Sequence, residues 1–374
     1  MVHESNLPPA APPGFTNHSF CSKAGIELNV RVWPANPTVV VGDGPAAPFV
    51  IWTHGGGWFG GFHFAPLKWM PAGFISRGYH LVSHNYRLAP QARVDDQLSD
   101  CLEAVAWCRA NLPLVLGKKK VDVDRYVLVG ESAGGHLVTL MGLHLNNPPP
   151  RAIVDLYGLV DFLALPAFSS YDPNHKPISK WDGSSEYTDA ELDAFLSDRN
   201  PQNTLTDALS WNEQELLTEE QLSKRWATDF KYTKRIKLQA ELHIRRTLTV
   251  SYEGLRRGVM HREKFGTEEE FIAFVKSMSP LMVLREQLER GIKRNYPPTA
   301  LLHGSGDEAV AIEQSYAMAK VLKELGVPIV ESYEKGEPHV FDKKYTNPNV
   351  PGWETYIQPV LDFVDHHVGH GHNV

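Results

Sequence analysis

Cysteine, long apolar runs and excess positive charge are all scarce in this 374-residue sequence. The three cysteines show no C-x-x-C or other metal-ligand spacing, and so few cysteines are typical of a reducing compartment. We therefore expect a cytoplasmic protein with neither disulfides nor a bound metal. The chain also has no apolar stretch long enough to span a bilayer, and its N-terminus lacks the basic and apolar regions of a secretory signal. A formal net charge of -7 argues against nucleic acid or an anionic membrane as a partner.

What the sequence does contain is typical of a globular protein. Hydrophobic residues make up 42% and charged residues 22%, and a chain of this length can bury a large core. Residues 1–18 are an exception, because their dense prolines disfavour both helix and strand pairing. We predict that they form an N-terminal arm or an extended strap.

Short apolar runs alternate with a helical pattern through the first half of the chain. The predicted strands are residues 26–33, 49–53, 79–84, 126–129 and 152–158, with helices at 96–112 and after residue 135. This alternation predicts an α/β protein with a mostly parallel central sheet and right-handed crossovers. Further strands are predicted at 298–303 and 327–333, and further helices at 312–325 and 353–367.

A long segment without strand patterns interrupts this alternation. Between residues 162 and 279 the sequence favours helices at 188–197, 212–227, 232–248 and 267–278. The segment is too long for a simple connection, so we interpret it as an inserted, mainly helical cap. The predicted domain organisation is therefore an arm at 1–18, a core at 19–161 and 280–374, and a cap at 162–279.

Residues 130–135 read Gly-Glu-Ser-Ala-Gly-Gly and lie between a predicted strand and a predicted helix. The pattern Gly130-x-Ser132-x-Gly134 is the signature of a nucleophile elbow, a tight turn that needs small residues on both sides of the serine. The N–H of Ala133, at the start of the helix, would point to where an oxyanion forms. The pattern alone is weak, since a glycine-rich turn without chemistry has the same composition.

A second glycine-rich loop follows the strand at 49–53. Three glycines in a row after His54 weaken regular structure and suit a loop whose backbone approaches a ligand closely. We interpret it as an oxyanion loop in which Gly56 and Gly57 donate N–H groups opposite the elbow, although a tight loop without chemistry is the simpler reading. We also expect Trp58 and Glu131, which lie next to these motifs, to contact the substrate.

Three sequence blocks together resemble the α/β-hydrolases related to hormone-sensitive lipase. The blocks are His-Gly-Gly-Gly-Trp at 54–58, Asn-Tyr-Arg-Leu-Ala-Pro at 85–90 and Gly-Glu-Ser-Ala-Gly-Gly at 130–135, in the order and spacing of that family. The resemblance implies an α/β-hydrolase fold with a cap and a carboxylesterase activity. One departure is Asn85, where members of the family commonly carry aspartate, and it puts a supporting contact in question.

The remaining candidates follow the last two predicted strands. Asp307 lies in a glycine-rich turn at the carboxyl end of a strand, where parallel sheets place functional groups, and it could equally cap the next helix. The resemblance implies that Asp307, rather than Glu308, is the acid of a catalytic triad. His339 stands in a block that resembles the family's His-x-Phe motif. Ser132, Asp307 and His339 then follow the chain order expected for this fold.

These residues predict a serine hydrolase that cleaves a small to medium, partly apolar carboxylic ester through an acyl-enzyme, with no cofactor. An amide or formamide hydrolase and a lactonase would use the same triad and stay open. A small-molecule receptor on a hydrolase fold is a further alternative, which the presence of all three triad candidates disfavours. The expected partner is thus a small molecule; we expect no stable membrane insertion, and the sequence leaves a homodimer open.

Overall fold

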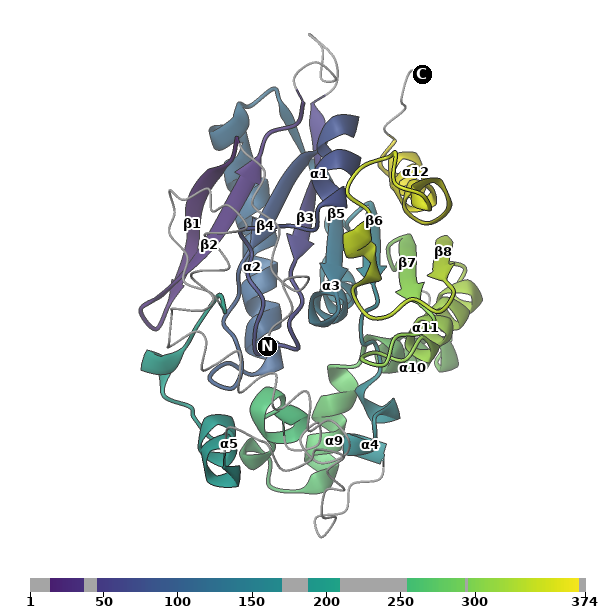
Figure 1. Cartoon of the computed structure of the whole chain (residues 1–374). Coiled ribbons are helices and arrows are strands. Elements are labelled where there is room, and N and C mark those ends of the chain that lie inside the picture. The colour runs from purple at the N-terminus through teal and green to yellow at the C-terminus, as the bar shows by residue number, and fades with distance from the viewer. Residues whose placement is uncertain (1–13, 37–45, 170–187, 209–253, 293–294, 370–374) are drawn as a thin grey trace.

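The computed structural model describes residues 14–36, 46–169, 188–208, 254–292 and 295–369 of the chain. Within these residues, eight strands form one sheet in the order β1-β2-β4-β3-β5-β6-β7-β8. Helices cover both faces of the sheet (Figure 1). The mostly parallel sheet and its flanking helices confirm the predicted α/β fold class.

The sheet is antiparallel at one edge and parallel elsewhere. The pairs β1–β2 and β2–β4 are antiparallel, and every pair from β4 through β3 to β8 is parallel. The parallel part aligns the carboxyl ends of its strands at one edge, where the loops of a functional site meet. The strands are β1 Thr16–Lys23, β2 Ile26–Trp33, β3 Ala47–Thr53, β4 His80–His84, β5 Val121–Glu131, β6 Ala152–Leu156, β7 Thr299–Gly304 and β8 Ile329–Glu334.

The helices connect these strands or lie in the segment between β6 and β7. They are α1 Trp69–Gly73, α2 Val94–Leu116, α3 Ala133–His144, α4 Pro166–Ser169, α5 Asp189–Leu196, α9 Glu268–Ser277, α10 Pro280–Glu289, α11 Glu313–Glu324 and α12 Gln358–Val368. Shorter 3₁₀ and π turns are η2 Ile75–Arg77, η3 Phe162–Ala164, η4 Pro201–Asn203, η6 Gly254–Val259, η7 Arg262–Lys264, η8 Phe341–Lys344 and η9 Trp353–Ile357. The predicted helix at 353–367 thus begins as a π turn and becomes α-helical only at Gln358.

Two hydrophobic cores lie on the two faces of the sheet. Along β3, Phe49 and Ile51 point into one core and Val50 and Trp52 into the other, because side chains alternate across a strand. Both faces are covered, so the strand is apolar along its whole length. This explains why the continuous apolar runs of the sequence are the central strands of the sheet.

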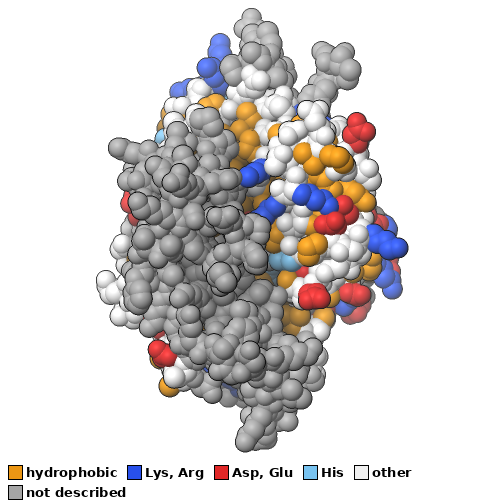
Figure 2. Space-filling view, in the orientation of Figure 1, with side chains coloured by type: hydrophobic (Ala, Val, Ile, Leu, Met, Phe, Trp, Pro, Cys, Tyr) orange, Lys and Arg blue, Asp and Glu red, His pale blue; other side chains and the backbone are white. Residues whose placement is uncertain are grey.

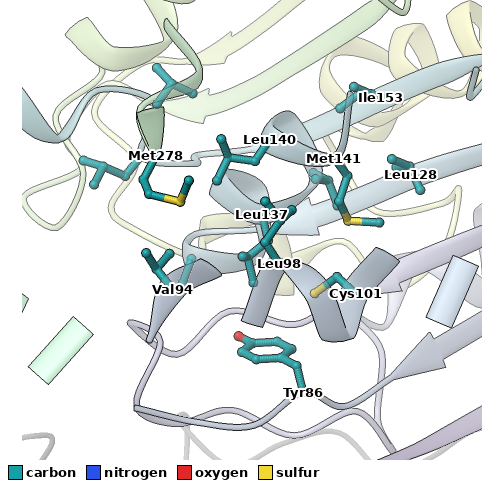
Figure 3. Close-up of a cluster of buried hydrophobic side chains, with 14 of the residues drawn as sticks. Tyr86, Val94, Leu98, Cys101, Leu128, Leu137, Leu140, Met141, Ile153 and Met278 are labelled. Atoms are coloured by element: carbon teal, nitrogen blue, oxygen red, sulfur yellow. The ribbon is translucent and has the colours of Figure 1, made fainter. Parts of the chain in front are cut away.

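The larger core contains the packing of α2 against α3. In Figure 3, Leu98 of α2 lies close to Leu137 of α3, and Met278, which follows α9, lies close to Leu140. Cys101 points into the same cluster and is fully buried. Its thiol therefore packs as a small apolar group.

The predicted N-terminal arm extends too far into the chain. Residues 16–18 belong to β1, which the sequence pattern did not reveal. β1 is mostly polar and partly exposed, and it is held by antiparallel pairing with β2. A polar edge strand has no hydrophobic alternation for a sequence pattern to detect. Residues 1–13 lie outside the described part of the chain.

The described part of the predicted cap range is helical. It contains α4, α5, α9 and short turns, and no β-strand among its described residues. In Figure 1 the arrowheads of β6 and β7 point towards the end of the molecule where α4, α5 and α9 lie. These helices are therefore close to the carboxyl ends of the strands. The predicted helices at 212–227 and 232–248 fall outside the described residues.

The described surface mixes side chains of both charge signs. On the face shown in Figure 2, basic and acidic side chains are interspersed with hydrophobic and uncharged ones. No helix among the described residues is long and apolar enough to cross a membrane.

Candidate active site

Ser132 occupies a strained turn between β5 and α3. Its backbone has φ 53° and ψ −117°, a conformation that side-chain-bearing residues rarely adopt. The flanking glycines make the turn sterically feasible. A Cβ on Gly130 would lie 2.2 Å from the carbonyl oxygen of Gly134, and a Cβ on Gly134 would lie 2.1 Å from that of Thr53. The local structure therefore matches a nucleophile elbow.

His339 follows β8 and reaches the serine. Its Nε2 lies 3.0 Å from Oγ of Ser132, and its Nδ1 lies 2.6 Å from Oδ2 of Asp307. The carboxylate of Asp307 can only accept a hydrogen bond, so Nδ1 of His339 carries the proton. Nε2 of His339 is then free of a proton and can accept the hydroxyl proton of Ser132. The structure thus joins the three residues in one hydrogen-bonded chain, although 207 and 32 positions separate the partners in sequence.

Four donors surround the carboxylate of Asp307. Oδ1 accepts the backbone N–H groups of Ala309 and Val310 at 2.7 and 2.9 Å. Oδ2 accepts from His339 and, at 3.2 Å, from Nε2 of His303. Burial acts to raise the pKa of Asp307, but the hydrogen bonds from His303 and His339 outweigh it, so this pKa lies well below its ordinary value. The carboxylate is therefore ionised, whereas Glu308 beside it is exposed.

His303 lies beside Asp307. The sequence patterns assigned no function to this histidine. Its Nε2–H is shared between Asp307 and the carbonyl oxygen of Val310, while Nδ1 accepts from the hydroxyl of Ser315 at 2.7 Å. The ring is fully buried in β7. The one available signal was its position near the end of β7, four residues before Asp307.

The glycine loop lies directly beside the elbow. A Cβ on Gly55 would lie 2.8 Å from the carbonyl oxygen of Glu131 and 3.1 Å from Cβ of Ser132, so only a glycine fits there without displacing its neighbours. Gly56 and Gly57 have φ values of 111° and 61°, in the region that favours glycine. Ala133 is the first residue of α3, and the first N–H groups of a helix have no acceptor within it. This arrangement is compatible with N–H donation to an oxyanion at Ser132.

A buried carboxylate from the predicted cap range holds the continuation of this loop. Oδ1 of Asp207 accepts both the backbone N–H and the Nδ1–H of His63, at 2.9 and 2.7 Å. Ala208 also donates its N–H to the carbonyl oxygen of Gly61 at 2.7 Å. Burial acts to raise the pKa of Asp207, but the interaction with His63 outweighs it and lowers that pKa to about 2. Asp207 was not a candidate in the sequence, because its partner lies 144 residues away.

Asn85 contacts the same carboxylate. Its Nδ2 donates to Oδ2 of Asp207 at 2.7 Å, and its Oδ1 accepts the backbone N–H of Asn29 at 2.7 Å. The supporting contact that seemed in question at this position is therefore present, with the carboxylate contributed by Asp207. An asparagine is suited to this place because it donates to one partner and accepts from the other.

The two predicted substrate-contacting residues have partners within the protein. The indole N–H of Trp58 donates to Nδ1 of His136 at 3.2 Å, and its ring packs against Phe162. Glu131 contacts the backbone N–H of Gly55 and the hydroxyl of Tyr157. These contacts favour supporting positions for Trp58 and Glu131 over the predicted contact with substrate.

Among the residues that the structure describes, no group of three or more His, Cys, Asp or Glu side chains could hold a metal ion. Cys21, Cys101 and Cys108 are all free thiols.

Comparisons with known proteins agree with this fold. Residues 41–201 match the BD-FAE family model, and residues 253–370 match that of the prolyl oligopeptidase family. The thermophilic esterase Est2 of Thermogutta terrifontis superimposes with a TM-score of 0.55 at 16% identity, over 100% of this chain and 99% of the other. The Pyrobaculum calidifontis esterase gives 0.51 at 17% identity, over 98% and 88%. At such identities the likeness shows the fold, and the chain is an α/β-hydrolase by fold.

Curated relatives extend the likeness to much larger proteins. The chain is 28% identical to the non-reducing polyketide synthase Preu6 of Preussia isomera, over 85% of this chain and 13% of the synthase. It is also 28% identical to the synthase stbA of Stachybotrys bisbyi, over 91% and 14%. The chain thus spans about one seventh of the length of these relatives. A shorter match, 31% identical over 31% of each chain, is to esterase LipC of Mycobacterium tuberculosis.

Proposed function

We propose that this protein is a serine hydrolase that cleaves carboxylic esters through an acyl-enzyme. The hydrogen-bonded chain from Ser132 through His339 to Asp307 carries the proposal. A serine hydroxyl is a weak nucleophile until an adjacent base accepts its proton. Here Nε2 of His339 is 3.0 Å from that hydroxyl, within the range for direct proton transfer.

The geometry supports the following sequence of steps. Oγ of Ser132 attacks the ester carbonyl while His339 takes its proton, and the ionised Asp307 stabilises the imidazolium. The tetrahedral intermediate then collapses as His339 returns the proton to the departing alcohol, leaving an acyl group on Ser132. Water, activated by His339 in the same manner, releases the acid and restores the serine.

The negative oxygen of each tetrahedral intermediate requires donors on the opposite side of the carbonyl. We assign this task to the N–H groups of Gly56, Gly57 and Ala133. The close approach of Gly55 to Ser132 supports this assignment, because it brings the glycine loop within reach of the elbow. Each well-placed donor of this kind contributes about 3 kcal/mol to the transition state.

The surroundings of the serine support a proposal for the substrate class. The mainly helical segment near the carboxyl ends of the strands supports a capped site for a small to medium, partly apolar ester. The likeness to non-reducing polyketide synthases favours an acyl thioester as a second candidate, because such synthases handle acyl chains and a thioester passes through the same kind of intermediate. The cytoplasmic location remains a prediction from the cysteine content.

A panel of substrates tests the proposal. p-Nitrophenyl esters of increasing acyl length, acyl thioesters and N-formylkynurenine would be assayed with the wild type and with Ser132→Ala. We expect turnover of short to medium esters and a loss of at least about 10⁴-fold in the alanine variant. Turnover of the formamide without any ester or thioester would show an amide hydrolase instead, and turnover of nothing would contradict the enzyme proposal.

A further inference from the structure

A chain of polar groups, of which Glu131 is partly buried and Tyr157 and Asp342 are fully buried, lies behind the reacting residues. Glu131, the residue before Ser132, places Oε2 3.2 Å from the hydroxyl oxygen of Tyr157. That hydroxyl lies 2.8 Å from Oδ1 of Asp342, whose Oδ2 accepts the indole N–H of Trp69 at 2.7 Å. The other oxygen of Glu131 is 3.4 Å from the backbone nitrogen of Gly55, in the glycine loop. This glutamate of the elbow thus contacts the glycine loop and Tyr157.

The hydroxyl of Tyr157 cannot donate fully to Glu131 and Asp342 at the same time. The tyrosine hydroxyl has a single proton but stands between two carboxyl groups. Asp342 accepts that proton over the shorter distance and accepts Trp69 on its other oxygen, so both of its oxygens have donors. Glu131 can then hydrogen-bond to the tyrosine oxygen only by donating a proton of its own.

Burial has the largest effect on the protonation of Glu131 and raises its pKa to about 7. The charge of Lys343 and the hydrogen bonds to Gly55 and Tyr157 act to lower that pKa, and the charge of Asp342 acts to raise it, but burial outweighs the lowering effects. Burial also raises the pKa of Asp342. The ring of Tyr157 packs edge-on against that of His339, with centroids 4.8 Å apart, which links the glutamate to the base of the site. Gly55 presents only its uncharged backbone.

We propose that Glu131 is a positioning residue that works as a neutral carboxylic acid, and that its ionisation slows the reaction at alkaline pH. The expected slowing at alkaline pH rests on the proposed ester hydrolysis, whereas the protonation of Glu131 does not. As a neutral acid, Glu131 donates to Tyr157 and accepts from Gly55, and so fixes both sides of Ser132. Once ionised, it no longer donates to Tyr157, and it places a negative charge beside the oxygen that becomes negative in the transition state.

Glu131→Gln separates this function from simple packing. A glutamine side chain has nearly the same shape, donates to Tyr157 through its amide and accepts from Gly55 through its oxygen, and cannot ionise. kcat and KM would be measured from about pH 6 to about pH 9 for the wild type, Glu131→Gln and Glu131→Ala, using the best p-nitrophenyl ester. Glu324→Gln, an exposed residue of α11, controls for the loss of a carboxylate elsewhere.

We expect the wild-type kcat to fall above about pH 7, by about threefold or more, and that of Glu131→Gln to stay level. Glu131→Ala should lose about tenfold in kcat at every pH, with little change in KM. The Glu324→Gln profile should follow the wild type. Superimposable profiles for the wild type and Glu131→Gln, or full activity in Glu131→Ala, would overturn the proposal.

Thermal unfolding tests the proton on Glu131 without any assay of activity. A carboxyl group with a raised pKa in the folded state loses stabilising effect as pH rises through the interval between its unfolded value, about 4.3, and its folded value. The Tm of Glu131→Gln should therefore exceed that of the wild type near pH 8 and match it near about pH 4. An equal Tm difference at both pH values would contradict a neutral Glu131, even if no ester were hydrolysed.

Discussion

Two buried aspartates hold the two sides of Ser132, and they do so in different ways. Asp307 takes its donors from its own turn, from the preceding strand β7 and from the turn after β8. Asp207 takes its shorter hydrogen bonds from His63 and Asn85, more than 100 positions away, and a longer one of 3.3 Å from the adjacent Thr206. The side held by Asp307 is therefore built within the core. The side held by Asp207 requires a residue of the predicted cap range to be in place. We infer that the side of Asp307 and His339 depends less on the predicted cap range than the side of the glycine loop does.

Asp307→Asn tests the core-built side and should have the largest effect. The amide oxygen can still accept the N–H groups of Ala309 and Val310, so the fold should persist. Its NH₂ group, however, cannot accept a proton from Nδ1 of His339, which then adopts the tautomer unable to act as base. We expect kcat to fall about 10³–10⁴-fold with little change in the free energy of unfolding. A loss of less than about tenfold in steady-state assays would remove Asp307 from the triad.

Asp207→Ala tests the side that depends on the cap range. Removing this carboxylate deletes its hydrogen bonds with the N–H groups of His63 and with Asn85, which lie in buried surroundings. We expect the free energy of unfolding to fall by about 3–5 kcal/mol in urea titrations. Displacement of the glycine loop should also lower kcat by about 10²-fold, because small misplacements of reacting groups are costly.

Asp193→Ala provides the control, since Asp193 is an exposed residue of α5 that forms an ion pair with Arg257. It should change stability by less than about 1 kcal/mol. An Asp207→Ala variant as active as this control would show that the loop needs no support from the cap range.

An exchange of residues tests whether Asn85 and Asp207 form a matched pair. Asn85→Asp alone would place two carboxylates in contact in a buried site, where like charges repel strongly. We expect a loss of about 2–3 kcal/mol in the free energy of unfolding. Adding Asp207→Asn reverses donor and acceptor and should recover part of that loss. Additive effects in this double-mutant cycle would show that the two side chains do not interact.

His303→Phe should have the smallest effect on catalysis. It removes one of four donors to Asp307 while keeping a ring in the buried site, and we expect kcat to fall about three- to tenfold. The wild-type carboxylate has a lowered pKa, so its stabilising effect is present above about pH 4 and is lost as pH falls. Acid unfolding of His303→Phe should therefore show a shallower dependence on pH. An unchanged dependence would show that His303 does not affect Asp307.

The two sides also differ in how well the sequence revealed them. Gly130, Ser132 and Gly134 form a local pattern within one turn of the sequence, and Asp307 follows a recognisable strand. Asp207 has no such pattern, because its significance depends on His63 and Asn85 being folded against it. β1 escaped detection for a related reason, since backbone pairing rather than apolar alternation holds it. Trp58 and Glu131 were placed next to the right motifs, yet proximity in sequence could not show which way their polar groups point.

Labelling with a fluorophosphonate tests the central claim most directly. The reagent forms a covalent bond with a serine only when that serine is activated as a nucleophile. We predict that intact-mass measurements show one label per wild-type chain, that peptide mapping places it on Ser132, and that Ser132→Ala takes up none. An unlabelled wild type, or a label on another residue that persists in Ser132→Ala, would contradict the account.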